Sequence, residues 1–297
     1  MDLHDISVLV MYAVTPCHAG SGSALGTVDL PIQRERHTNW PLIQSSGMKG
    51  AFRANFDRYK DTKLEEKDRE QFKSLSDTIF GDTNAAGSAY AGAISISDAK
   101  ILAFPMRSNV APFVWISCPA VLRRLNRDLA LAGKNIAPAG IDAIAALVTD
   151  NKEDNKALCI NGGLAGRVLL EDYEVEIVPG DTVFLKPLSD YFCAAERLLL
   201  VSDEIFNYGV SDCTQINAQI SIDPEKGTTK DGSLRYQEEL PADTLMYSII
   251  HWGDTRSGEE LKAGTIRSFI KDKVISTHIQ AGGDETLGRG IFELEWK

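Results

Sequence analysis

A nine-residue apolar run near the start of the chain, ISVLVMYAV from Ile6 to Val14, constrains the fold most strongly. It is rich in β-formers and lacks polar alternation, a pattern typical of a strand buried on both faces. Such a strand needs other elements packed on each side of its sheet. Because the run ends shortly before His18, we expect the strand to deliver this histidine at its end.

A glycine-rich segment follows His18, with glycines at positions 20, 22 and 26. Absent side chains let backbone amides approach a ligand closely, which makes Gly20 and Gly22 candidate binding positions. The segment is not a dinucleotide fingerprint, because Leu25 occupies the third glycine position and no helix pattern begins there. Asp29 then stands alone among apolar neighbours, where a turn or capping residue is the usual interpretation.

Residues 45–60 carry apolar side chains at helical spacing, and Ser45 or Ser46 can cap the start of this helix. Lys49 lies in its first turn, and Arg53 follows one turn later on the same face. Free N–H groups, the helix dipole and two cations favour phosphate binding, although a solvated helix edge would look the same. The spacing Ser46-x-x-Lys49 also fits penicillin-binding hydrolases, but the S-D-N and K-T-G elements are missing.

Apolar periodicity and breakers predict the remaining elements. Strands are expected within 89–104, at 167–178, 214–222 and 244–252, and on either side of a glycine loop over 276–296. Helices are expected over 60–71, 114–133, 141–151, 188–208 and 258–273. Between the strand at 214–222 and the strand at 244–252, the polar stretch DPEKGTTKDGSLRYQEELP (223–241) indicates a protruding β-hairpin.

The order of these features resembles the RAMP superfamily of CRISPR proteins. The matching segments are His18 with its glycine loop, VDLPIQRE (28–35), NWPLI, SSGMKGAFR (45–53), AYAGAISISDAKILAFPMRS (89–108), DPEKGTTKDGSLRYQEELP (223–241) and the terminal GGDETLGRGIFEL. They are collinear over nearly the whole chain. Within the superfamily, the chain is similar to the repeated backbone subunit of the type III-B (Cmr) RNA-guided effector complex.

The resemblance implies an α+β fold with a ferredoxin-like, RRM-type palm. A helical insertion, the fingers, is expected over about 60–160, and a β-hairpin, the thumb, over about 214–243. With 297 residues, 43% hydrophobic and 25% charged, the chain can build one large core, so we expect a single domain over residues 1–297.

The resemblance also implies a role in CRISPR antiviral defence. The family's backbone subunit binds guide RNA and cuts complementary target RNA at regular intervals, by metal-dependent attack of a ribose 2′-OH on the adjacent phosphate. The implied partners are the guide RNA, the target RNA, a large polymerase-like subunit, a small helical subunit, capping RAMP subunits and further copies of this chain in head-to-tail contact. The hairpin is expected to wedge between bases of the guide–target duplex.

Residue roles carry over from the resemblance. Asp29 is expected to be the cleavage residue, and His18 to orient the phosphate or assist proton transfer. Tyr236, Glu238 and Glu239 of the hairpin are expected near the cut. A single carboxylate is a poor permanent magnesium site, so Mg²⁺ or Mn²⁺ should bind Asp29 weakly, with help from the substrate. The predicted RNA-binding residues are Gly20, Gly22, Arg34, Arg36, Ser46, Lys49, Arg53 and Arg289.

The net charge of −11 argues against RNA binding, since phosphate contacts need Lys and Arg. Cations nevertheless outnumber anions between residues 29 and 60, which predicts a basic groove on an acidic body. The five cysteines form no C-x-x-C pair and are expected to be reduced. No apolar run has membrane-spanning length and no secretory signal begins the chain, so we expect a cytoplasmic protein without membrane contact.

A purely structural subunit that binds guide RNA without cutting is the main alternative. Asp29 is the residue that separates the two hypotheses, because a scaffold has no need of a carboxylate beside the RNA. A catalytic Asp29 could be replaced without loss of assembly, whereas a structural Asp29 could not.

Overall fold

The computed structural model describes residues 5–82, 90–134, 138–149, 155–179, 186–192, 194–256 and 260–297. At its centre lies an antiparallel sheet in the order β14-β1-β12-β4. The strands are β1 (Ile6–Ala13), β4 (Ala99–Arg107), β12 (Leu245–Trp252) and β14 (Ile291–Trp296). The strand predicted from the apolar run is thus confirmed, with β12 and β14 as its neighbours.

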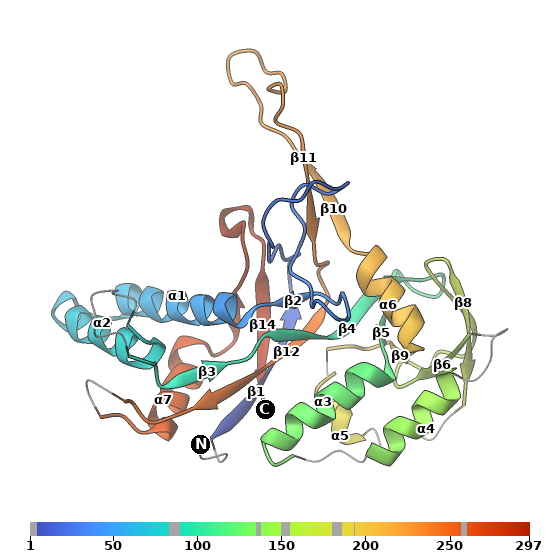
Figure 1. The fold of residues 1–297 in the computed structure, drawn as a ribbon, viewed down its shortest axis with the longest axis horizontal. Coiled ribbons are helices and arrows are strands. Elements are labelled where there is room, and N and C mark those ends of the chain that lie inside the picture. The colour runs from blue at the N-terminus through green and yellow to red at the C-terminus, as the bar shows by residue number, and fades with distance from the viewer. Residues whose placement is uncertain are drawn as a thin grey trace.

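Three helices cover one face of this sheet (Figure 1). They are α1 (Ser45–Lys63), α2 (Glu66–Phe80) and α7 (Ala263–Phe269), the last continued by a π-helical turn over Ile270–Val274. Phe56 of α1 is fully buried and stacks on Phe72 of α2 with ring centroids 5.0 Å apart. Phe52 meets Trp296 of β14 edge-to-face at 6.2 Å. Aromatic packing of this kind buries the largest apolar areas and fixes α1 on the sheet.

A second helical layer contacts the opposite face through α3 (Pro119–Leu131). Asp128 of α3 is buried, and its carboxylate accepts hydrogen bonds from the Lys100 ammonium at 2.5 Å and the Tyr247 hydroxyl at 2.9 Å. A buried charge persists only when paired in this way. The two-sided covering explains why β1 has no polar alternation.

Strand β4 is long enough to join two sheet regions. Its second half pairs with β5, and the sheet then continues in the order β9-β6-β8-β7 with both parallel and antiparallel neighbours. The bounds are β5 (Phe113–Ser117), β6 (Lys156–Cys159), β7 (Gly166–Leu170), β8 (Tyr173–Val178) and β9 (Leu198–Leu200), with helices α4 (Pro138–Thr149), α5 (Lys186–Ser189) and α6 (Asp203–Asp212).

A two-stranded hairpin rises from the body, formed by β10 (Gln215–Gln219) and β11 (Arg235–Glu239), and its tip stands clear of the other elements (Figure 1). The remaining short elements are β2 (Leu42–Ile43), β3 (Ile94–Ile96), β13 (His278–Gln280) and a 3₁₀ turn over Glu285–Leu287. The α+β class and the protruding hairpin predicted from the sequence are confirmed.

Several predicted elements are wrong in extent. The helix predicted from residue 114 begins only at Pro119, because residues 114–117 belong to β5, and residues 60–160 therefore hold strands as well as helices. Two strands joined at Glu171, whose φ is +50°, replace the single strand over 167–178. The predicted helix over 60–71 is divided between α1 and α2, which runs on to Phe80.

The long helix predicted over 188–208 is also wrong. Leu198, Leu199 and Leu200 form β9, which pairs with β5 on one side and β6 on the other, so an apolar triplet that fits a helix is used as a buried strand. Ser202 then caps α6 by accepting a hydrogen bond from the Ile205 N–H at 3.2 Å. That capping serine, followed by acidic residues, was the signal for a new helix start.

Candidate functional site

Asp29 lies on the edge of β11 that β10 leaves free. Its backbone N–H donates to the Tyr236 carbonyl at 3.1 Å, and its side-chain Oδ2 accepts from the Tyr236 N–H at 2.7 Å. Leu30 continues the pairing as a parallel bridge to Gln237. Figure 1 shows the dark blue segment after β1 running beside the base of the hairpin. The second carboxylate oxygen, Oδ1, has no partner in the described part of the chain and remains open to a ligand.

His18 is attached to the same strand edge, two residues further along. Its Nδ1 lies 2.7 Å from the Glu238 carbonyl oxygen, which can only accept, so Nδ1 carries the hydrogen. In the neutral ring, Nε2 is then the unprotonated nitrogen. Because two strand residues span roughly 7 Å, the anchors of His18 and Asp29 at Glu238 and Tyr236 are close neighbours. The structure thus brings together the two residues predicted to be catalytic.

Glycines shape the surroundings of this imidazole. A Cβ on Gly20 would lie 2.7 Å from His18 Nε2, so the missing side chain at this position makes room for the ring. On the other side, the Gly283 N–H donates to the His18 carbonyl at 2.8 Å, and a Cβ on Gly282 would lie 2.9 Å from that same oxygen. The C-terminal glycine loop (281–290) therefore packs directly against the backbone of His18.

Cys17 lies beneath this loop and is fully buried. Its thiol donates to the Ala281 carbonyl at 3.4 Å, and burial together with the nearby Glu239 charge raises its pKa to about 12. Since the thiolate is the reactive form, Cys17 is an inert packing residue at neutral pH. This agrees with the predicted reduced state.

Glu238 and Glu239 are buried, with 6% and 1% of each residue exposed. Glu238 pairs with Arg34 at 2.5 Å, and Glu239 pairs with Arg289 at 3.0 Å while accepting from Asn217. Both carboxylates are thus bound within the protein, which argues against direct contact with RNA, and the catalytic role of both stays a prediction. Tyr236 differs, because the residue is 42% exposed and its backbone holds Asp29.

Two of the predicted RNA-binding residues, Arg34 and Arg289, are the cations of these two ion pairs. The Arg34 and Arg289 guanidinium groups neutralise buried carboxylates, so both charges serve the fold. Arg34 is largely buried, whereas 31% of the Arg289 side chain is exposed. Arg36, in contrast, is exposed on a turn closed by the Glu35 N–H to Trp40 carbonyl bond. That turn is fastened to α3, since Glu35 binds both ends of the Arg124 guanidinium at 2.6 and 2.8 Å.

The start of α1 differs from the prediction. Gln44 is the N-cap and no side chain caps the helix; Ser45 and Ser46 belong to its first turn. The Ser45 N–H donates to the Asp98 carboxylate at 2.7 Å, so a protein anion already uses part of the positive helix end. Asp98 follows 53 residues later in the chain, and no local sequence signal could have predicted this contact. Ser46 is exposed.

Lys49 and Arg53 have different surroundings on this helix. Arg53 pairs with Asp77 and donates to the Gly81 carbonyl at 2.9 Å, so it joins α1 to the end of α2 instead of serving as a free phosphate ligand. No hydrogen bond or ion pair links Lys49 to the described residues. Partial burial and the neighbouring Arg53 lower the pKa of Lys49. An anion at this position would oppose that lowering of the pKa, which keeps Lys49 as the phosphate candidate of α1.

A groove of about 560 Å³ separates the hairpin from the glycine loop. It is lined by Asn217, Ala218, Gln219, Ile220, Ser221, Ser233, Arg235, Leu287 and Arg289. Carboxamides and hydroxyls dominate, and Arg235 donates twice to Gln219, at 3.0 and 2.8 Å. Side chains of these types bind base edges and ribose hydroxyls.

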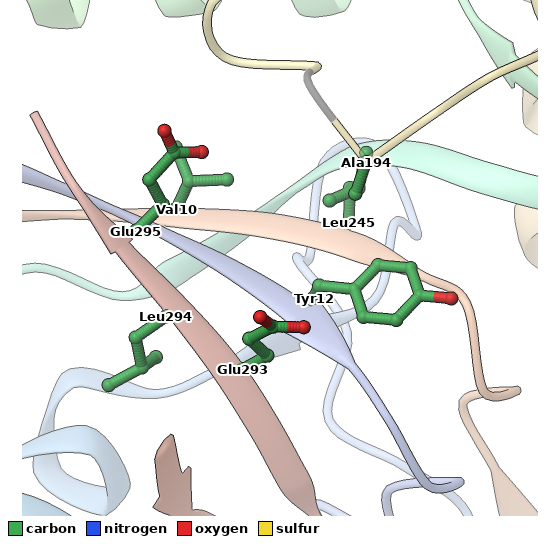
Figure 2. Close-up of a pocket in the computed structure, with 7 residues that line it drawn as sticks. All are labelled: Val10, Tyr12, Ala194, Leu245, Glu293, Leu294 and Glu295. Carbon is green, nitrogen blue, oxygen red and sulfur yellow. The ribbon is translucent and has the colours of Figure 1, made fainter. Parts of the chain in front are cut away.

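A second cavity, of about 270 Å³, has the opposite character. The cavity has apolar lining from Val10, Leu245 and Leu294. Two carboxylates of β14, Glu293 and Glu295, also line it, as Figure 2 shows. Tyr12 also lines it and donates to Asp243. Carboxylates at this position repel phosphate, so the RNA groove predicted from the local charge balance has to lie elsewhere.

Within the described ranges, no three His, Cys, Asp or Glu side chains gather closely enough to form a metal centre. No helix in the described part of the chain is long and apolar enough to cross a bilayer.

One known protein family matches almost all of this chain. The model of the RAMP superfamily matches residues 10–293, which is nearly the whole chain. The chain belongs to the RAMP superfamily. The match includes His18, Asp29 and the whole C-terminal glycine loop, so the site described above lies inside the RAMP region.

Individual relatives agree with this assignment. The CRISPR system Cmr endoribonuclease Cmr4 of Pyrococcus furiosus is 35% identical over 298 residues, covering 97% of this chain and 94% of that protein. The crystal structure of oligomeric Cmr4 from Pyrococcus furiosus superposes with a TM-score of 0.67 at 26% identity, covering 98% and 97% of the two chains. A chain of the type III-B Cmr-beta complex bound to cognate target RNA shares the fold, with a TM-score of 0.72, 21% identity and coverage of 98% and 96%.

In this RAMP chain, tertiary pairing decides which predicted residues stay accessible. His18, Asp29 and Tyr236 meet at one strand edge, whereas Arg34, Glu238, Glu239 and Arg289 lie in buried pairs. The sequence reasoning missed Gln237 and Asp284, whose 2.6 Å hydrogen bond joins the hairpin to the glycine loop. Asp284 has a φ of +58°, and only its position between glycines marked it as a turn residue.

Proposed function

We propose that this RAMP chain is an RNA-guided endoribonuclease subunit of a type III-B CRISPR complex, acting in antiviral defence. The observation that carries the proposal is the pairing of Asp29 and His18 on the free edge of β11, with Asp29 Oδ1 open. The 35% identity to a protein named Cmr endoribonuclease supports RNA cleavage as the activity.

We infer a palm and a thumb from the topology. β1, α1, β4, β12, α7 and β14 follow the βαββαβ order of a ferredoxin-like palm, with the antiparallel sheet order β14-β1-β12-β4. The hairpin β10–β11 is the thumb, and Ile216, Ile220, Leu234 and Tyr236 are exposed on it. Apolar side chains at such a tip can wedge between bases and unstack them at a cost of a few kcal/mol per step.

The proposed chemistry is attack of a ribose 2′-OH on the adjacent phosphorus. The 2′-O–P bond forms and the P–O5′ bond breaks, leaving a cyclic phosphate and a 5′-OH. Asp29 takes the proton of the 2′-OH, and protonated His18 gives the Nε2 proton to the leaving 5′-oxygen. Displacement of a nucleotide by the thumb supplies the in-line geometry that a continuous A-form strand lacks.

A divalent ion, Mg²⁺ or Mn²⁺, is part of the proposal. Asp29 Oδ1 can offer it one oxygen, with RNA phosphates and water completing the shell, because Mg²⁺ keeps several waters in sites of this kind. When bound, the ion would offset phosphate charge. The protein residues themselves hold Asp29 in place and exchange protons with the RNA.

The guide RNA is proposed to pass the start of α1 and the carboxamide-lined groove. Lys49, Arg36 and Arg235 are the accessible cations along this path, and base pairing to the guide reads the target sequence. Copies of the chain would stack head to tail. The oligomeric crystal structure of the Pyrococcus furiosus relative supports self-association. The large polymerase-like, small helical and capping RAMP subunits complete the proposed assembly.

The guide-loaded assembly should cut a labelled complementary RNA at regular intervals in the presence of Mg²⁺ or Mn²⁺. Removal of the ion with EDTA should stop cutting while target binding persists, and the 5′ fragments should end in cyclic phosphate. Gel electrophoresis with a non-complementary RNA as control measures this. Tight target binding without cuts in either metal would instead establish the scaffold alternative.

Replacing Lys49 with alanine should weaken guide RNA binding and reduce the slope of log K against log salt by about 0.7, the value for one phosphate contact on a single strand. Lys63, exposed in the last turn of the same helix, is the matched control, and Lys63→Ala should leave the slope unchanged. Fluorescence anisotropy over a salt series measures both variants. An identical slope for Lys49→Ala and wild type would exclude Lys49 from the guide path.

A further inference from the structure

The buried carboxylate of Glu238 is bound on both oxygens. Oε2 accepts from the Ile32 N–H at 3.0 Å, while Oε1 accepts from Arg34 Nη2 at 2.5 Å and from the Thr214 hydroxyl at 2.8 Å. Ile32 and Arg34 belong to the segment that leaves Asp29, and Thr214 precedes β10. One side chain therefore ties the segment after Asp29 to the base of the hairpin.

The backbone of Glu238 strengthens the same connection. Its N–H donates to the Leu30 carbonyl at 2.9 Å, and its carbonyl accepts from His18 Nδ1 at 2.7 Å. Glu238 thus contacts His18 and the residue next to Asp29 through its main chain, and the rest of the segment through its carboxylate. Asp29 itself is bound two residues earlier on the strand, at Tyr236.

Arg34 extends the connection to the second sheet region. Its Nη1 donates to the Asn39 carbonyl at 2.8 Å and to the Val210 carbonyl of α6 at 2.9 Å. Side-chain exposure is only 15% for Arg34 and 8% for Glu238, so water screens this pair weakly. If the carboxylate lost its charge, the guanidinium would stay buried without a counter-ion and would have to move. The segment from Leu30 to Arg34 would move with it.

We propose that Glu238 is a positioning residue for target cleavage, which sets the place of Asp29 through the backbone of Ile32 and the side chain of Arg34. The inference rests on the proposed function and gives an indirect role to a residue whose carboxylate is buried and paired. Both of its oxygens are satisfied inside the protein, so it neither transfers a proton nor binds the substrate. Its effect passes through geometry, and a displacement of about 1 Å at a reacting group can cost 100-fold in rate.

The test compares Glu238→Gln with Asp128→Asn in the guide-loaded assembly. The two residues are comparable, because Asp128 is also a buried carboxylate bound by cations, Lys100 and Arg127, and by the Tyr247 hydroxyl, but it contacts neither segment of the site. Single-turnover cleavage at saturating target, target affinity, Tm and amide hydrogen exchange are measured for both. Exchange reports local opening of the 29–34 segment and needs no catalysis.

Glu238→Gln should lower the cleavage rate about 100-fold with unchanged target affinity, and should speed exchange over residues 29–34. Asp128→Asn should lower Tm without either effect. Equal cleavage rates and equal exchange for the two variants would overturn the positioning role. If Glu238→Gln does not assemble, Arg34→Lys provides the test, since it keeps the charge but loses the fork that reaches Asn39 and Val210. An unchanged rate in Arg34→Lys would then overturn the proposal.

The two proposals can fail separately. If the wild-type assembly binds target without cutting it, the nuclease function fails, and the exchange experiment still decides whether Glu238 holds the 29–34 segment. If the wild type cuts and only the Asp29 variants are inactive, the nuclease function stands and the positioning role falls.

Discussion

Replacing Asp29 with alanine is expected to abolish cutting of the target RNA, by at least the roughly 10² to 10⁴-fold that a positioned proton acceptor contributes. Guide binding and assembly should be retained. The reason is that the loop does not depend on this side chain alone: the backbone N–H groups of Asp29 and Leu30 both donate to the Tyr236 carbonyl, and these bonds persist in the alanine variant. Cleavage assays on the loaded assembly measure the first effect, and gel shifts the second.

Asp29→Asn tests the charge of the residue separately from its shape. The amide oxygen can still accept from the Tyr236 N–H, so shape and anchoring are kept while the charge and the proton acceptor are lost. The asparagine variant should be as inactive as the alanine variant. An active Asp29→Asn would assign the residue a structural role, and loss of assembly in both variants would lead to the same conclusion.

Gly290→Ala is expected to lower the free energy of unfolding by about 2 to 5 kcal/mol, the sum of positive-φ strain and two lost hydrogen bonds. Gly290 has a φ of +71°, and a Cβ there would lie 2.0 Å from the Ala281 carbonyl oxygen. Relief requires the loop to open, which breaks the Ala281 N–H to Gly290 carbonyl bond and the Gly290 N–H to Pro16 carbonyl bond. Chemical denaturation measures the change.

Gly288→Ala is the matched control in the same loop. Its φ is +73°, but a Cβ would meet no atom within 4 Å, so only the backbone strain of about 1 to 2 kcal/mol applies. The difference between the unfolding free energies of the two variants therefore measures the cost of the steric clash with Ala281. Because Gly283 is bonded to the His18 carbonyl, Gly290→Ala should also reduce cleavage, whereas Gly288→Ala should not. Equal stability of the two variants would contradict the steric argument.

The buried pairs of this protein show why charged residues in a motif are poor guides to binding. The glycine loop contains Arg289 and the hairpin contains Glu239, and either could have faced RNA as far as local sequence is concerned. In the fold, the two meet at 3.0 Å with Glu239 almost completely buried, because a carboxylate at the junction of hairpin and loop needs a cation. Lys49 lacks such a partner among the described residues and keeps its predicted role.

Secondary structure was predictable where periodicity was unambiguous. β1, α1, β12 and the hairpin β10–β11 follow from apolar runs, helical spacing and turn residues. The predicted helix over residues 188–208 was wrong, because the apolar triplet Leu198–Leu200 is compatible with either a helix or a strand. Pairing with β5 and β6 decided for a strand, and these partners lie about 80 and 40 residues earlier in the chain.

The sequence by itself determined the α+β class, the family resemblance, and Asp29 and His18 as the residues to test, because these depend on local patterns and collinear motifs. Only the tertiary structure decided which of the neighbouring charges are accessible. Arg34 lies 204 residues from Glu238, and Arg53 lies 24 residues from Asp77. Burial and charge pairing are properties of contacts between distant segments, and no local pattern encodes them.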